Sequence, residues 1–145
     1  MTHLLTLTAQ LRLVGLALVG MGLLHAVLPR ILNWPGDLGG TSLLTRQVSY
    51  AHVFFIGLTC VLLGALPLAF ARELLSGDPL PTVLLCGQTL FWGLRWVMEF
   101  AYFSPRLWRG HRLRTAGHVA LSVLWTWVTL VFVLATWHAA GQGPL

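Results

Sequence analysis

Lysine is absent from this 145-residue chain, and acidic residues are scarce. Nine Arg stand against four Asp and Glu, which gives a formal net charge of +5 at pH 7. Only 9% of the residues are charged whereas 57% are hydrophobic, so the surface lacks the polar cover of a soluble domain. The arginines lie mostly beside apolar segments, which favours topology control and anionic lipid headgroups. We therefore expect a lipid bilayer, and no nucleic acid, as the partner of this chain.

Cysteine is also scarce, which excludes a disulfide framework as the basis of the fold. The two cysteines, Cys60 and Cys86, both lie within apolar runs, where small buried hydrophobic residues are expected. A cleavable secretory leader is not expected either. The first apolar run continues to Pro29 with no convincing small-residue cleavage site after it, so we predict that it is retained as a helix.

Long apolar segments dominate what is present. Four of them, at residues 13–29, 47–71, 82–103 and 115–138, are separated by clusters of Gly, Pro and Ser. Each has the ~17 to 25 residues that cross a hydrocarbon core about 30 Å thick. We predict an all-α integral membrane protein, in which residues 1–145 form a single domain, an antiparallel bundle of four transmembrane helices. Pro67 falls late in the second segment, where it kinks the helix or marks its end.

The arginines are unevenly divided between the two predicted sides of the membrane. The first and third loops hold Arg30, Arg46, Arg106, Arg109, Arg112 and Arg114, whereas the opposite side holds only Arg12 and Arg72. Loops rich in Arg stay in the cytoplasm. We therefore predict that both termini face away from the cytoplasm, in the cell (inner) membrane.

Each predicted segment carries one ionisable residue at a similar depth. These residues are His25, His52, Glu99 and His118. From their spacing to the cytoplasmic loops, all four lie roughly 6 to 9 Å inside the same boundary. Ionisable residues are costly in a membrane and tend to be functional or tightly paired. We therefore predict that the four converge in the cytoplasmic half of the bundle.

Further polar and small residues share helical faces with these four, and we expect these faces to point into the bundle. Glycines on such a face let a neighbouring backbone approach closely. The faces are Gly15, Leu18, Gly22 and His25 in the first segment; Thr45, Ser49, His52 and Thr59 in the second; Gln88, Trp92, Arg95, Glu99 and Tyr102 in the third; Thr115, His118, Ser122, Trp125, Thr129 and Thr136 in the fourth.

Three imidazoles and a carboxylate are ligand types for zinc, iron, copper or manganese, and helical bundles often hold such sites. Paired imidazoles also ligate haem. We therefore predict His25, His52, Glu99 and His118 as ligands of a transition metal ion, or the three histidines as ligands of a haem. Arg95 and Glu99 are the predicted catalytic residues of an oxidoreductase or its subunit. Its substrate would be a lipid-soluble small molecule, such as a quinone, that enters sideways from the bilayer.

Two other interpretations use the same residues. In a small proton-coupled transporter, the histidines change charge near neutral pH. In a non-catalytic accessory subunit of a larger membrane complex, they form a structural polar core. Arg95 and Glu99 stand four residues apart on one helix and are able to pair with each other. Such a pair neutralises the carboxylate and makes a metal site less favourable.

The predicted orientation is testable with reporter fusions. One reporter is fused after Leu145 and another is inserted within residues 31–45. Because six loop arginines outweigh two, the C-terminal fusion should report a non-cytoplasmic location and the loop insertion a cytoplasmic one. A C-terminal reporter active in the cytoplasm would contradict this orientation.

Overall fold

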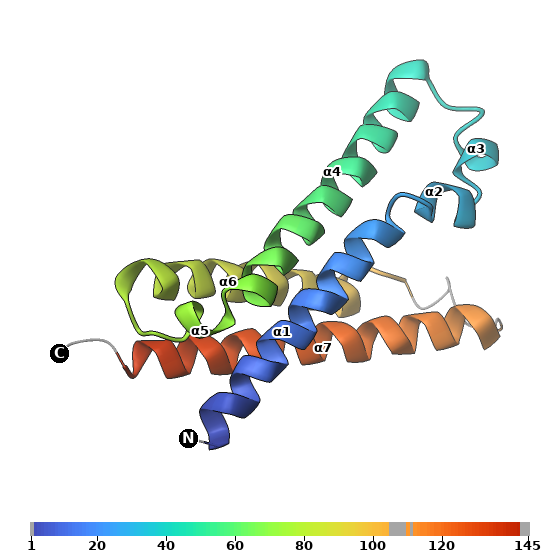
Figure 1. Ribbon diagram of the computed structural model, residues 1–145. Coiled ribbons are helices and arrows are strands. Elements are labelled where there is room, and N and C mark those ends of the chain that lie inside the picture. The colour runs from blue at the N-terminus through green and yellow to red at the C-terminus, as the bar shows by residue number, and fades with distance from the viewer. Residues whose placement is uncertain (1, 105–109, 111, 143–145) are drawn as a thin grey trace. The chain divides into compact units, whose positions relative to one another are not determined.

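The computed structural model describes residues 2–104, 110 and 112–142, and all regular structure in these residues is helical (Figure 1). The long helices are α1 (Thr2–Leu24), α4 (Leu43–Ala69), α6 (Pro79–Ala101) and α7 (Arg112–Ala140). The short helices are α2 (Leu28–Ile31), α3 (Trp34–Asp37) and α5 (Ala71–Leu74). The prediction of an all-α protein is confirmed.

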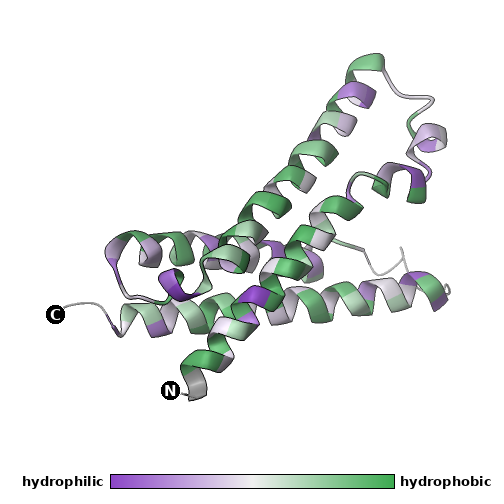
Figure 2. Cartoon of the chain, viewed as in Figure 1, coloured by the Kyte–Doolittle hydropathy of each residue, from purple (hydrophilic) through white to green (hydrophobic). Residues whose placement is uncertain are grey.

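Three of the long helices have the length and composition to cross a membrane. They are α1 from Leu4 onward, α4 and α7. Figure 2 shows apolar residues around most of α4, with its hydrophilic residues near its N-terminal end. Large apolar side chains are exposed along the helices, as expected for a surface in lipid. Examples are Phe54, Phe55 and Leu62 of α4, Leu90 and Leu94 of α6, and Val123 and Leu134 of α7.

Helix α6 occupies the third predicted segment but is not among those three helices. It carries Gln88, Arg95 and Glu99, and these polar side chains lower its mean hydropathy. The structure thus agrees with four long helices, three of which qualify as membrane spans by composition. Pro67 lies inside α4, close to its last residue, Ala69.

The first helix differs most from its predicted bounds. It begins at Thr2 rather than at residue 13, so Arg12 lies in the middle of α1 and not before it. The helix ends at Leu24 rather than at Pro29, which instead stands in the first turn of α2. Proline fits there because the first helical residues have no intrahelical partner for their N–H groups. Arg106 and Arg109, two of the six predicted loop arginines, lie outside the described residues.

The chain divides into two compact units. Unit 1 consists of Met1–Leu11 and Ala71–Leu145, and unit 2 of Arg12–Phe70. Unit 1 therefore contains α5, α6 and α7, and unit 2 contains α2, α3 and α4. The two parts of α1 fall in different units.

Within unit 2, glycines bring the backbones of α1 and α4 into contact. A Cβ atom placed on Gly22 would lie 2.6 Å from the carbonyl oxygen of Gly57, and one on Gly15 would lie 2.6 Å from that of Gly64. Neither distance leaves room for a side chain. The predicted close approach at Gly15 and Gly22 is confirmed, and the partner helix supplies glycines at the same seven-residue spacing.

Within unit 1, α6 and α7 run antiparallel and pack along their length (Figure 1). The hydroxyls of Thr89 and Thr136 are 2.8 Å apart, and Trp96 donates from its indole to Thr126 at 2.9 Å. The N-terminal part of the chain also contributes, because Trp127 donates to the Gln10 side chain at 2.9 Å. The buried apolar side chains of these two helices are Leu85, Trp92, Trp125, Val128, Val131, Phe132, Ala135 and Ala139.

The glycine contact predicts opposite effects for alanine at two nearby positions. Alanine favours a helix by about 1 kcal/mol over glycine, whereas overpacking costs about 1 to 3 kcal/mol. Gly20→Ala meets no atom within 4 Å, so we expect it to raise the melting temperature in detergent. Gly22→Ala should lower that temperature, because its Cβ would press on Gly57 and Val61. Equal melting temperatures for the two variants would show that the contact is unimportant.

Candidate functional site

Glu99 of α6 joins the two long helices of unit 1. Its side chain is 3% exposed, and each of its oxygens has a partner. Oε2 lies 3.0 Å from Nη1 of Arg95, one turn earlier on α6, and Oε1 lies 2.9 Å from Nδ1 of His118 on α7. The pairing of Arg95 with Glu99 follows from the helix repeat, whereas the contact with His118 depends on how α6 and α7 pack. We call these three residues the Glu99 network.

The chemistry of the acceptor fixes the hydrogen-bond directions in this network. An ionised carboxylate only accepts hydrogen bonds, so Nδ1 of His118 carries a proton and donates it to Glu99. Arg95 donates to the other oxygen. With a neutral imidazole, the arginine and the carboxylate balance each other and the network has no net charge. Such balance makes a buried carboxylate tolerable in apolar surroundings.

Aromatic rings give the Arg95 cation a second set of contacts. Its guanidinium carbon lies 4.8 Å from the ring centroid of Trp125 and 5.9 Å from that of Phe103. Trp125 in turn stacks on Trp92, with centroids 5.4 Å apart. A ring face attracts a cation through its quadrupole. Arg95, at 31% exposure, therefore stands between the carboxylate and an aromatic surface.

Polar contacts continue along the α6 and α7 interface beyond the network. Trp92 donates from its indole to Gln88 at 2.8 Å, and the Thr129 hydroxyl donates to the Trp92 carbonyl at 3.2 Å. The predicted polar faces of the third and fourth segments thus face each other over much of their length. At the ends of these faces, Tyr102 and Thr115 are exposed. Sequence reasoning missed Thr89, which pairs with Thr136.

Three buried polar atoms on α6 and α7 have no hydrogen-bond partner among the described residues. They are Thr82 Oγ1, Ser122 Oγ and Trp125 Nε1. Buried polar atoms are nearly always hydrogen-bonded, so each of these requires an explanation. Ser122 stands one helical turn after His118, and Trp125 lies under Arg95. Unsatisfied hydrogen-bonding capacity therefore adjoins the Glu99 network.

The other two predicted ligands, His25 and His52, lie in unit 2 and bond to their own helices. Nδ1 of His25 donates to the Met21 carbonyl and Nδ1 of His52 to the Val48 carbonyl, each at 2.8 Å. His25 is half-buried and His52 is exposed. On α4, the surface against α1 is built around Gly57 and not on the predicted face that includes His52. The reason is that glycine permits backbone contact.

The metal or haem site of four residues stays a prediction. It requires His25 and His52 from unit 2 together with Glu99 and His118 from unit 1. In the part of the chain that the structure describes, no group of three or more His, Cys, Asp or Glu side chains is arranged to hold a metal ion.

Similarity to known proteins gives no guide to the chemistry. The chain matches no protein-family model, no curated protein and no solved structure. Its function is therefore inferred from its own contacts, of which those of Glu99 carry the most chemical information.

A double-mutant cycle measures the coupling of Arg95 and Glu99. Arg95→Gln leaves a buried carboxylate without its cation, so we expect a loss of about 3 kcal/mol of unfolding free energy in detergent. The double variant Arg95→Gln with Glu99→Gln should regain most of that loss, because no charge is left unpaired. If the two losses simply add, the pair is not coupled.

Proposed function

We propose that this chain is a small membrane protein that moves protons, with Glu99 and His118 as the groups that exchange them. A proton-coupled transporter is the class that such a site fits. One observation carries the proposal: a buried carboxylate is shared between an arginine on its own helix and a histidine on the neighbouring helix. Histidine is the side chain whose charge ordinarily changes near neutral pH.

Proton uptake would take place at His118. In the neutral ring, Nδ1 carries the hydrogen that is bonded to Glu99. The ring becomes an imidazolium and the network gains one positive charge. Its contact with Glu99 then becomes an ion pair, and such charge-assisted hydrogen bonds are the stronger ones. Loss of the same proton restores the neutral network.

Arg95 provides a way to couple this step to movement of the side chains. Once His118 is charged, a single carboxylate serves two cations, so the bond between Arg95 and Glu99 weakens. Arg95 is the more exposed of the two residues and already contacts the Trp125 ring, which stabilises its cation. We infer that Arg95 shifts toward this ring when His118 takes up a proton. A two-state element of this kind is what proton coupling requires.

A polar route along α6 and α7 supports proton movement away from the network. Ser122 and Trp125 lie beside it, and Thr129, Thr136 and Thr82 continue the line of polar groups toward the other end of the helix pair. The three unpartnered buried atoms fit this role, because water that satisfies such atoms is able to relay protons.

This function requires α6 to cross the membrane as the fourth span. Its 23 residues span about 34 Å, which matches the hydrocarbon core. Pairing within the Glu99 network lowers the cost of placing Arg95 and Glu99 there. A four-helix transmembrane bundle in the cell membrane, with both termini outside the cytoplasm, completes the proposal. The arginine distribution supports this orientation.

The contacts of Glu99 favour proton exchange over metal binding. A divalent cation at the carboxylate would be repelled by the Arg95 guanidinium, which is 3.0 Å away. Metal or haem binding, and oxidoreductase activity, therefore remain the less favoured hypothesis from the sequence. Measured metal content and visible absorbance of the purified protein decide between the two.

Proton flux into vesicles tests the proposal directly. The purified chain is reconstituted into liposomes, and acidification driven by a potassium diffusion potential is followed with a pH-sensitive dye. We expect the wild type to exceed protein-free vesicles, and Glu99→Gln and His118→Gln to fall to the leak rate. His138→Gln, on the same helix as His118 but outside the network, is the matched control and should keep wild-type flux.

Two results would overturn the proposal. The first is a wild-type flux no greater than that of protein-free vesicles. The second is full flux in Glu99→Gln. Stoichiometric metal or haem that is present in the wild type and lost in Glu99→Gln would instead favour the metal site. Gel filtration and circular dichroism of each variant verify that the helices remain folded.

A further inference from the structure

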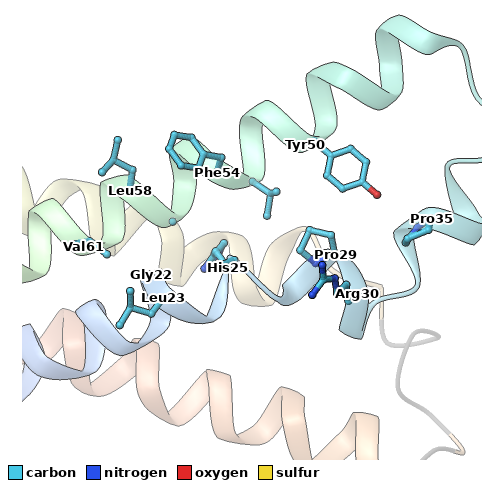
Figure 3. Close-up of a pocket in the computed structure, with 13 residues that line it drawn as sticks. Gly22, Leu23, His25, Pro29, Arg30, Pro35, Tyr50, Phe54, Leu58 and Val61 are labelled. Atoms are coloured by element: carbon cyan, nitrogen blue, oxygen red, sulfur yellow. The ribbon is translucent and has the colours of Figure 1, made fainter.

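Unit 2 contains a cavity of about 720 Å³ that the Glu99 network does not involve (Figure 3). This volume lies within the usual range of small-molecule sites. The cavity is formed by the end of α1, by α2, by the start of α3 and by the first half of α4. Its lining includes Gly22, His25, Arg30, Tyr50, Leu58 and Val61.

The same glycine contact that joins α1 and α4 accounts for the position of the cavity. At Gly22 and Gly57 the two backbones touch, and beyond this point α1 and α4 diverge toward the end that carries α2 and α3 (Figure 1). Without large side chains on these glycines, the space between the diverging helices stays open. The cavity is therefore built into the helix crossing.

The cavity has apolar walls and one polar end. In Figure 3, Leu58 and Val61 lie toward one end, whereas Tyr50, Arg30 and Pro35 lie toward the other. Arg30 makes no ion pair or side-chain hydrogen bond with a described residue, and neither does the Tyr50 hydroxyl. The other polar group in the lining is His25, whose Nδ1 already donates to Met21 and whose Nε2 is an acceptor in the neutral ring.

We propose that this cavity binds one anionic phospholipid from the surrounding bilayer. Its phosphate lies at Arg30, and an acyl chain follows the apolar wall toward Leu58 and Val61. Charge complementarity carries this choice: guanidinium binds phosphate through parallel hydrogen bonds, and Asp37 is the only acidic residue of unit 2. Basic pockets between membrane helices bind lipid headgroups in this way. The proposal is independent of proton exchange at Glu99.

The remaining polar groups fit a phospholipid with a hydroxylated headgroup. The Tyr50 hydroxyl is a donor for a phosphate or ester oxygen, and His25 Nε2 is an acceptor for a headgroup hydroxyl. Phosphatidylglycerol offers all of these partners. Phosphatidylcholine has a phosphate but carries a compensating quaternary ammonium and no headgroup hydroxyl, so it should bind more weakly.

Native mass spectrometry of the detergent-purified full chain tests the proposal. The protein is titrated separately with phosphatidylglycerol, phosphatidylcholine and oleate. We expect one phosphatidylglycerol per chain, bound more tightly than the other two. Arg30→Gln should weaken this binding about tenfold, as expected for the loss of a charge-assisted contact. Arg46→Gln removes an exposed arginine of the same unit that does not line the cavity, and should bind as the wild type does.

A second variant tests the location without changing the charge. Ala26→Phe places an aromatic side chain in the cavity lining and should reduce phosphatidylglycerol binding while the helices stay folded. Three outcomes would overturn the proposal: equal binding of phosphatidylcholine and phosphatidylglycerol, tighter binding of oleate, or unchanged binding in Arg30→Gln. Glu99→Gln should bind the lipid normally, so failure of the proton proposal would leave this one standing.

Discussion

Hydrocarbon offers a helix no hydrogen-bond partner and little hydrophobic reason to associate with another helix. The two units of this chain meet that constraint in different ways. In unit 2, α1 and α4 touch through glycines, so close packing of backbones holds the pair together. In unit 1, α6 and α7 exchange hydrogen bonds between side chains, and the contact of Glu99 with His118 is one of them. In each unit, the candidate functional site lies where the two long helices pack together.

In the Glu99 network, helix packing and the proposed function would use the same atoms. A carboxylate that is 3% exposed needs partners in order to exist in apolar surroundings, and Arg95 and His118 are those partners. One of the two is a histidine, so the proposed proton exchange would act on the same contact that stabilises the helix pair. The unpartnered atoms of Ser122 and Trp125 lie beside the network, where a relay would need them.

The cavity of unit 2 also depends on residues that lack a side chain. Glycines that let α1 and α4 touch at one level leave space where the helices diverge, and Arg30 stands at the polar end of that space. A cation with no acidic partner among the described residues, next to apolar walls, is suited to a lipid phosphate. In the proposed lipid complex, Nε2 of the neutral His25 ring is the hydrogen-bond acceptor, because Nδ1 donates to the Met21 carbonyl.

The sequence by itself determined the helices and the contacts that lie within one helix. Apolar runs indicated the four long helices, and the helix repeat placed Gly15 and Gly22 on one face and brought Arg95 within reach of Glu99. The sequence did not determine where α1 begins. The predicted segment starts after the charged Arg12, whereas the residues before Arg12 also belong to the helix. The position of a residue along a helix fixes its depth in the membrane, but not the direction in which its side chain points around the helix axis. Only the tertiary structure therefore decided that His118 bonds to Glu99 while His52 is exposed. The cavity beside Arg30 likewise depends on the angle between α1 and α4, which glycine spacing permits but does not specify.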